Sequence, residues 1–277
     1  MKQFLLLVGF VVAGIFKPVQ AENVCGISTL AFKAGEALNY QLYYNVGFIW
    51  VKAGTCDFAV DRAEWDNKKA LKLSIVGRTD PSFDSFFHVR DSFISYVDNE
   101  TLTPYKSYKY THEDKWLGTD IFTFRPSNGG WRITTNLKRK GVWKDPVESV
   151  TPNCGFDILT SIYRMRSFDE AGLFVKGHAI NIPVRLDDGE YVIHMTYLGK
   201  ERIKLHSNGY YTANAFQLTL VEGKIFKRGD VLKMWISDDG NCIPLMIESP
   251  IRVGSVKAIF RTGENTLRPI VRPAATK

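Results

Sequence analysis

Hydrophobic and polar residues alternate along most of this chain. Leu38, Tyr40 and Leu42 are separated by polar Asn39 and Gln41, which is the two-residue period of a half-buried β-strand. The same alternation recurs at residues 56–60, 71–75, 93–97, 121–124, 131–133, 182–186, 191–195, 215–221, 232–236, 243–247 and 251–260. Asp, Asn, Gly or Pro bounds most of these runs, so the pattern predicts many short strands.

The turn residues indicate how these strands are connected. Gly47 and Gly54 are expected to bracket a short strand at 48–51, and the Asp-Asp-Gly sequence at 187–189 predicts a hairpin. A second hairpin is expected around the polar residues 237–241. Many short strands joined by tight turns favour an all-β, mostly antiparallel sheet that curls on itself. We therefore expect an incomplete barrel or β-roll.

One segment, residues 158–166, has a helical period instead. Asp157 is a good N-cap residue, and Ile158, Ile162 and Met165 fall on one face of the helix. Two arginines in the last turn suit the negative end of the helix dipole. The sequence therefore predicts one short helix that covers the open side of the curled sheet.

The first 21 residues have the features of a secretory signal peptide. Lys2 supplies the positive start, residues 4–16 are apolar, and Val19 and Ala21 occupy the −3 and −1 positions of a cleavage site. An apolar run of about 13 residues is shorter than the ~20 that a membrane-spanning helix needs. Residues 1–21 are therefore predicted to be removed on export, which leaves a soluble chain without a transmembrane segment.

The mature chain, starting at Glu22, is predicted to form one domain. No linker rich in Pro or Gly divides it, and no internal repeat is found. We expect a single β-rich domain over residues 22–263. The tail, residues 264–277, contains Pro269 and Pro273 and is predicted to be disordered.

The charge of the chain is mildly basic. Removal of the leader takes away Lys2 and Lys17 and no acid, so the formal net charge of +7 falls by 2 to +5. The densest cationic run is 138–140, with Lys144 just beyond Trp143. This cluster could meet an anionic surface such as phospholipid headgroups or a polyanionic glycan; the alternative is a solvated strand edge. Nucleic acid is excluded as a partner by the expected export.

Four cysteines are present: Cys25, Cys56, Cys154 and Cys242. Up to two disulfides with three connectivities are open to them in an oxidising compartment. Cys154 has an alternative role as a nucleophile, because it lies three residues before Asp157 at the expected start of the helix. Since no histidine is near it in sequence, a disulfide or a buried thiol is favoured over a nucleophile.

No motif for catalysis, a metal or a cofactor is found. The five histidines lack metal-ligand spacing, and there is no nucleophile elbow or phosphate-binding loop. The polar turn at 237–241 has oxygens that could hold calcium, although a hairpin turn explains its Asp-Gly sequence equally well. The helix face around residue 163 could line a cleft over the sheet. The candidate ligand-binding residues are therefore Tyr163, Arg166, Trp235, Asp238 and Asp239.

Several motifs resemble a family of exported bacterial proteins, domain-of-unknown-function family 3108. They are Phe32-Lys33-Ala34-Gly35-Glu36, Leu38-Asn39-Tyr40, Val51-Lys52-Ala53-Gly54, Val89-Arg90-Asp91-Ser92-Phe93, residues 157–166, Trp235-Ile236-Ser237-Asp238-Asp239, Ile243-Pro244-Leu245 and Val253-Gly254-Ser255-Val256. The resemblance covers roughly residues 32–260. It implies export and one β-rich domain, and it supplies no reaction, ligand or catalytic residue.

Three functions are compatible with this sequence. The first is a periplasmic or extracellular protein that binds a lipid or another hydrophobic ligand inside the curled sheet. The second is a hydrolase of an envelope polymer, with a site built from Asp157, Asp238, Asp239 or Cys154. The third is a glycan-binding or adhesion module that uses exposed tryptophans such as Trp65, Trp116 and Trp143. The sequence favours binding over catalysis and leaves the oligomeric state open.

Overall fold

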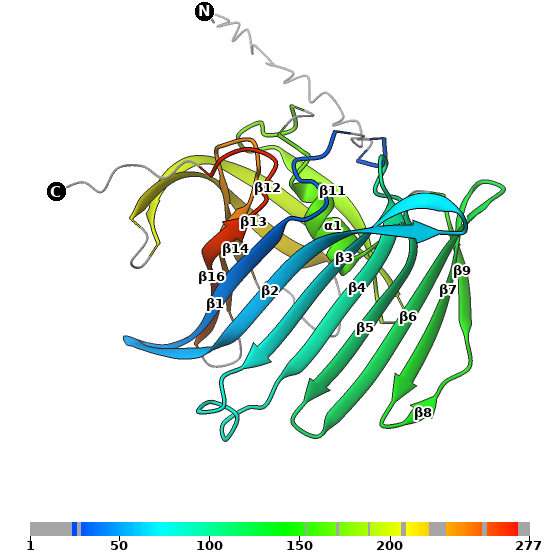
Figure 1. Ribbon diagram of the computed structural model, residues 1–277, viewed down its shortest axis with the longest axis horizontal. Helices are drawn as coiled ribbons and strands as arrows, with labels where there is room; N and C mark the ends of the chain where they lie inside the picture. Colours follow the sequence, from blue (N-terminus) through cyan, green and yellow to red (C-terminus); the bar gives the residue numbers. More distant parts are fainter. Residues whose placement is uncertain are drawn as a thin grey trace, which may run out of the picture.

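The structure, a computed structural model, describes residues 24–26, 29–152, 154–169, 172–187, 189–205, 209–221, 231–250 and 254–270. The predicted signal peptide, residues 1–21, lies outside these ranges. The strands are β1 (Ala37–Val46), β2 (Ile49–Trp65), β3 (Lys68–Thr79), β4 (Arg90–Asp98), β5 (Pro104–Glu113), β6 (Trp116–Ser127), β7 (Gly130–Arg139), β8 (Val142–Trp143), β9 (Val147–Thr151), β10 (Phe156–Asp157), β11 (Ala179–Leu186), β12 (Gly189–Lys204), β13 (Tyr210–Val221), β14 (Val231–Ser237), β15 (Pro244–Pro250) and β16 (Ser255–Glu264). The helix is α1 (Ile158–Met165) (Figure 1).

Within the described residues, all strands belong to one 16-stranded sheet, ordered β10-β11-β12-β13-β14-β15-β16-β1-β2-β3-β4-β5-β6-β7-β8, with β9 paired to β7. Because β16 pairs with β1, the last strand closes onto the first in the middle of the sheet. The pairs are antiparallel except for the short parallel pair β10–β11. The prediction of a mostly antiparallel all-β fold is confirmed.

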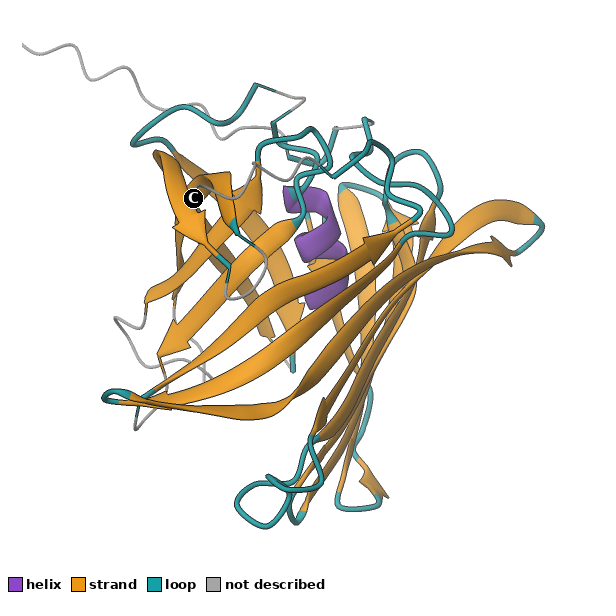
Figure 2. Cartoon of the chain, turned by 60° about the vertical axis from the view of Figure 1, so that its left-hand side comes forward, coloured by secondary structure: helices purple, strands orange, loops and turns teal. Residues whose placement is uncertain are grey.

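The sheet curls until its two ends approach each other, but it does not close (Figure 2). Asp187, after β11, lies 3.6 Å from Lys109 of β5 and 3.4 Å from Arg139 of β7. Thr151 of β9 donates to Glu190 of β12 at 3.0 Å. These contacts are made by side chains; within the described residues, no backbone ladder joins β10 to β8 or β9. The predicted incomplete barrel is therefore what the structure shows.

Helix α1 lies within the curl, where it contacts β3, β4, β10 and β11 (Figure 2). Asp157 caps it as predicted, accepting hydrogen bonds from the backbone N–H groups of Leu159 (3.0 Å) and Thr160 (3.1 Å). Ser95 of β4 donates to the same carboxylate at 2.7 Å. The cap therefore also ties the helix to the sheet, and Leu159 is fully buried in the core.

One local prediction is wrong. Gly47 is a turn residue with φ 59°, but Gly54 lies inside β2 instead of ending a short strand. It is needed there because an added Cβ would lie 2.2 Å from the carbonyl oxygen of Arg78 on β3. The structure describes the tail as far as residue 270. The side chain of Asn241 accepts a hydrogen bond from the backbone N–H of Arg268 at 2.7 Å and donates one to the carbonyl oxygen of Arg268 at 2.9 Å. Residues 271–277 lie outside the described part of the chain.

Candidate functional site

The two ends of the curled sheet differ in how they are filled. In an antiparallel meander, alternate turns lie at the same end, so the turns after β1, β3, β5 and β7 share one end. We call this the open end, and the opposite end, which holds α1, the closed end. On β1, Leu38 and Tyr40 are buried in the core cluster that also contains Tyr163 of α1. Leu42 and Tyr44 continue the same face toward the open end, where they line a cavity.

This apolar cavity has a volume of about 720 Å³, which is in the usual range of small-molecule sites. Its walls come from the inward faces of β1 to β4, from Val256 of β16 and from the loop at residues 80–89. Most of the lining is hydrophobic, including Leu42, Tyr44, Ala53, Ile75, Phe83, Phe86, Phe87, Val89 and Phe93. The site can therefore hold an apolar ligand between the strands β1 to β4 and the loop 80–89.

The loop 80–89 is held across the mouth of the cavity by polar contacts. Asp84 forms an ion pair with Arg90 at 2.7 Å and accepts a hydrogen bond from Thr79. The hydrogen bonds from Arg90 and Thr79 hold the pKa of the Asp84 carboxyl below its usual value. Phe83 packs edge-on against Tyr44 with ring centroids 6.2 Å apart. The loop is thus fixed at its base while its phenylalanines face the cavity.

Few polar groups reach the cavity. Arg78 borders the cavity, but alternation places its side chain on the same outer face of β3 as Val76, where it pairs with Asp57 at 3.3 Å. Asp91 lies on an inward face and accepts from the backbone N–H of His112 at 3.0 Å. Burial raises the pKa of the Asp91 carboxyl. Burial also raises the pKa of the Cys56 thiol to about 12, so this thiol stays neutral and is a poor nucleophile. The arrangement suits binding better than covalent chemistry.

Two other cavities are less suitable. A pocket of about 140 Å³ is lined by the predicted helix face of Ile158, Ile162 and Met165. It is smaller than a typical ligand site. A cleft of about 600 Å³ at the closed end combines apolar residues such as Leu30 with the exposed Lys33 and Arg62, so an apolar ligand there would lie beside cationic side chains.

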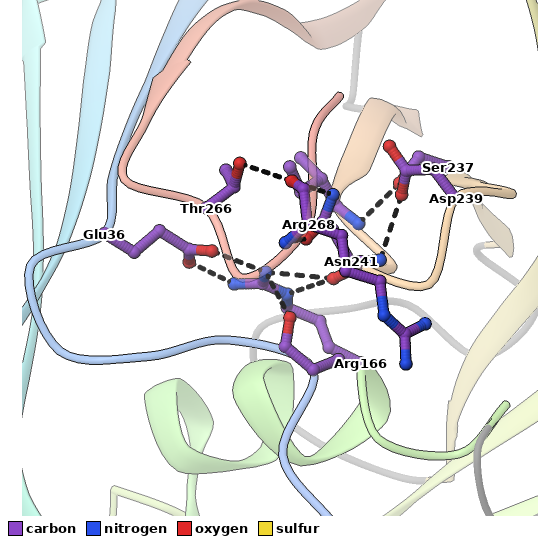
Figure 3. Close-up of polar contacts among 9 residues, drawn as sticks. Glu36, Arg166, Ser237, Asp239, Asn241, Thr266 and Arg268 are labelled. Carbon is purple, nitrogen blue, oxygen red and sulfur yellow. Dashed lines mark hydrogen bonds and ion pairs between the residues drawn. The ribbon is translucent and has the colours of Figure 1, made fainter. Parts of the chain in front are cut away.

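Two of the predicted ligand-binding residues, Arg166 and Asp239, are linked through Asn241 at the closed end (Figure 3). Arg166 pairs with Glu36, with Nη1–Oε1 and Nη2–Oε2 distances of 2.5 and 2.9 Å, and also donates to the carbonyl oxygen of Asn241 at 2.9 Å. Asp239 accepts from the backbone N–H of Asn241 at 3.0 Å and from Ser237 at 2.7 Å, so it stabilises a hairpin turn. These contacts join the C-terminal end of α1 to the segment before β1 and to the turn between β14 and β15.

The other three candidates lie apart from the apolar cavity. Tyr163 is buried in the core, and burial raises the pKa of its hydroxyl. Asp238 forms an ion pair with Lys200 at 2.6 Å, and Trp235 donates to Glu201 at 2.7 Å. Within the described residues, no group of three or more His, Cys, Asp or Glu could hold a metal, so the calcium interpretation of the turn has no support.

The cysteines form one disulfide, Cys25–Cys154, with a Cα–Cα distance of 5.6 Å. Cys56 and Cys242 remain thiols. The bridge joins the segment before β1 to the segment before α1, and it removes the Cys154 thiol from any role as a nucleophile. Sequence reasoning proposed these cysteines without choosing among the pairings, since their separation of 129 residues carries no local signal.

Sequence reasoning expected a ligand cavity inside the curled sheet but did not identify the residues that line the apolar cavity. Its clearest signal is the cluster of Phe83, Phe86 and Phe87, three large apolar residues in a loop of only ten residues (80–89) between β3 and β4. Loops are usually polar, so such a cluster indicates a surface that faces something other than water.

Comparisons with known proteins agree with this fold. The family described as "Protein of unknown function (DUF3108)" matches residues 39–261. A crystal structure of a "Beta-barrel-like Protein of Domain of Unknown Function DUF1849 from Brucella abortus" is similar with a TM-score of 0.53 and 10% identity, covering 83% of this chain and 97% of that chain. At this identity the likeness shows the fold alone. No curated protein matches the sequence. Among the described residues, no helix has the length and apolar character to cross a bilayer.

Proposed function

The chain belongs to the DUF3108 family, and we propose that it binds a lipid or another hydrophobic ligand in the apolar cavity. The observation that carries this proposal is the cavity of about 720 Å³ between the inward faces of β1 to β4 and the phenylalanines of the loop 80–89. The side chains that face this cavity make fewer van der Waals contacts than the side chains of the same strands that pack near α1. A bound apolar ligand would restore those contacts.

The polar groups of the cavity suggest how a ligand is oriented. Asp91 lies on the inward face of β4 and belongs to the lining, whereas most of the remaining lining is apolar. A ligand with a long apolar body and a polar end group fits this distribution, because a buried polar group needs a partner. The apolar body would lie along Leu42, Ile75 and Phe93, with its end group near the mouth.

We propose that this binding takes place outside the cytoplasm. The features of residues 1–21 support export, and the Cys25–Cys154 disulfide supports an oxidising compartment. In this view the protein carries or holds a hydrophobic molecule in the cell envelope.

A titration with a fluorescent fatty acid tests the proposal. Gly77 lines the cavity, and a Cβ added there meets no atom within 4 Å, so Gly77→Leu adds a side chain to the cavity without a steric clash at its base. We expect this variant to bind the probe at least about tenfold more weakly than the wild type, equivalent to ~1.4 kcal/mol.

The matched control is Val76→Leu. Val76 is the neighbouring residue of β3, which alternation directs to the other face of the sheet, and it is 40% exposed. This variant should bind the probe as the wild type does. Equal affinities of Gly77→Leu and Val76→Leu, or no binding of the probe by the wild type, would refute the proposal.

A further inference from the structure

Exposed large hydrophobic residues gather at the open end of the sheet. Phe48, at the β1–β2 turn, is 93% exposed and Trp50 is 47% exposed. Phe86, in the loop 80–89, is 82% exposed. Trp116, after the β5–β6 turn, is 42% exposed, and Trp143 of β8 is 51% exposed. We call these five residues the aromatic rim; the turns that carry them lie along the lower edge of the sheet in Figure 1.

The rim is larger than its five aromatic residues. Ile49 and Val51 extend it on the β1–β2 hairpin, and Leu117 and Val142 extend it beside Trp116 and Trp143. Large apolar residues that are exposed together at one end of a domain mark an interaction site. Trp65, which was also expected to be exposed, is instead half-buried against Tyr105, with ring centroids 6.1 Å apart. The exposed tryptophans are therefore concentrated at this one end.

Cations accompany three rim aromatics. Lys257 lies 4.6 Å from the ring centroid of Trp50, Lys138 lies 5.6 Å from that of Trp143, and Arg139 lies 5.9 Å from that of Trp116. Pairs of this type place an amphipathic ring beside a positive head, as at the interface between lipid tails and headgroups.

Two further lysines, Lys140 and Lys144, are exposed in the same part of the rim. Two nearby acids are already paired within the protein: Asp80 lies 3.7 Å from Lys52, and Asp84 lies 2.7 Å from Arg90. Asp114 and Asp145 are exposed acids of the same end. Of the cations beside the rim aromatics, Lys257 is paired with Glu248 at 3.2 Å and Arg139 with Asp187 at 3.4 Å. The positive charge that complements an anionic surface therefore comes from Lys138, Lys140 and Lys144.

From this geometry we infer that the aromatic rim docks the protein on the surface of an anionic phospholipid bilayer. The rim residues lie on several separate turns at one end of the sheet. They can contact a broad surface together more easily than they can enter a narrow groove of a partner. The rim is also continuous with the apolar cavity, since Phe86 belongs to both. Docking would bring the cavity mouth to the lipid; that this contact loads or unloads a ligand rests on the proposed function.

Flotation with vesicles tests the inference. The exported, disulfide-bonded protein is mixed with vesicles of phosphatidylethanolamine and phosphatidylglycerol, and the fraction that floats is measured. We expect the variant Phe48→Ser, Trp50→Ser to bind at least about tenfold more weakly, because burial of one large apolar side chain changes a transfer equilibrium by this factor or more. The matched control is Val175→Ser, Leu198→Ser, which removes exposed apolar residues (57% and 38% exposed) away from the open end and should float as the wild type does.

The role of charge is tested separately. Lys140→Glu, Lys144→Glu should weaken binding by about fivefold or more for each cation that contacts headgroups, and the loss should shrink at high salt. The control Lys68→Glu, Lys69→Glu changes two exposed lysines of the closed end and should have no effect. Vesicles of phosphatidylcholine alone should bind the wild type less tightly.

Failure of the inference can be distinguished from failure of the proposed function. The cavity variant Gly77→Leu should float normally and lose the fatty-acid probe, whereas the rim variant should lose flotation and keep the probe. The docking inference would be overturned if the wild type did not float with vesicles and bound soluble envelope polysaccharide instead. It would also be overturned if the rim variant floated as the wild type does. If Gly77→Leu both bound the fatty-acid probe and floated as the wild type does, only the cavity proposal would be overturned.

Discussion

Arg166 and Glu36 form an ion pair that is buried on both sides, with side-chain exposed fractions of 2% and 0%. Burial by itself would lower the pKa of Arg166, but the hydrogen bonds and charge of Glu36 outweigh this effect, and the pKa of the guanidinium is raised. The guanidinium of Arg166 therefore remains charged at the closed end, where its pairing with Glu36 joins the end of α1 to the segment before β1.

Removal of one partner should be costly. In Glu36→Gln the guanidinium of Arg166 loses its counter-charge while it stays buried, so we expect the free energy of unfolding to fall by about 3–5 kcal/mol in urea denaturation. Asp61→Asn, which breaks the exposed pair with Lys72 (3.8 Å), should cost less than about 1 kcal/mol. Equal losses for the two variants would show that the buried pair has no special role.

The Cys25–Cys154 bridge should contribute to stability because it closes a loop of 129 residues. Cys25→Ser, Cys154→Ser is expected to lower the unfolding free energy by roughly 3–5 kcal/mol. Reductant should destabilise the wild type by a similar amount and leave this variant unchanged. If all four cysteines react with an alkylating agent in unreduced, denatured protein, the bridge is absent.

The raised pKa of Asp157 should make the stability of the protein fall as pH rises in the acidic range. Burial raises the pKa of its carboxyl, with hydrogen bonds from Ser95 and Thr160 partly opposing the shift. Between the ordinary Asp pKa of about 3.9 and the raised value, the folded state holds more protons than the unfolded state, so this group makes stability fall as pH rises. Asp157→Asn, which keeps an acceptor for the cap, should remove this slope in urea unfolding measured across the acidic range.

Asp84 provides a control of opposite sign. Because hydrogen bonds from Arg90 and Thr79 lower its pKa, its contribution is present above the ordinary carboxyl pKa and is lost as pH falls through the lowered value. Asp84→Asn should therefore weaken the loss of stability toward acid. The same sign of change in Asp157→Asn would contradict the burial that the structure gives to Asp157.

Local signals predicted much of the fold. Two-residue alternation identified the strands, and a capping Asp157 before a helical period identified α1, because both features depend on neighbours in sequence. The pairing of Arg166 with Glu36, 130 residues away, and the choice of Cys25 for Cys154 depend on how the sheet curls and have no such signal.

The lining of the candidate site could not be predicted from local sequence signals either. Leu38 and Tyr40 alternate just as Leu42 and Tyr44 do, yet the first pair packs in the core with α1 and the second lines an open cavity. Alternation predicts the direction in which a side chain points. It carries no information on whether another element fills the space that the side chain faces.

Native mass spectrometry is the most direct test of the proposed binding. Protein purified from the envelope without detergent is measured before and after incubation with lipid vesicles, together with Gly77→Leu and Val76→Leu. The account predicts a non-covalent, hydrophobic adduct of one molecule per chain on the wild type and on Val76→Leu, and a strongly reduced adduct on Gly77→Leu. An unliganded mass for the wild type under both conditions would contradict it.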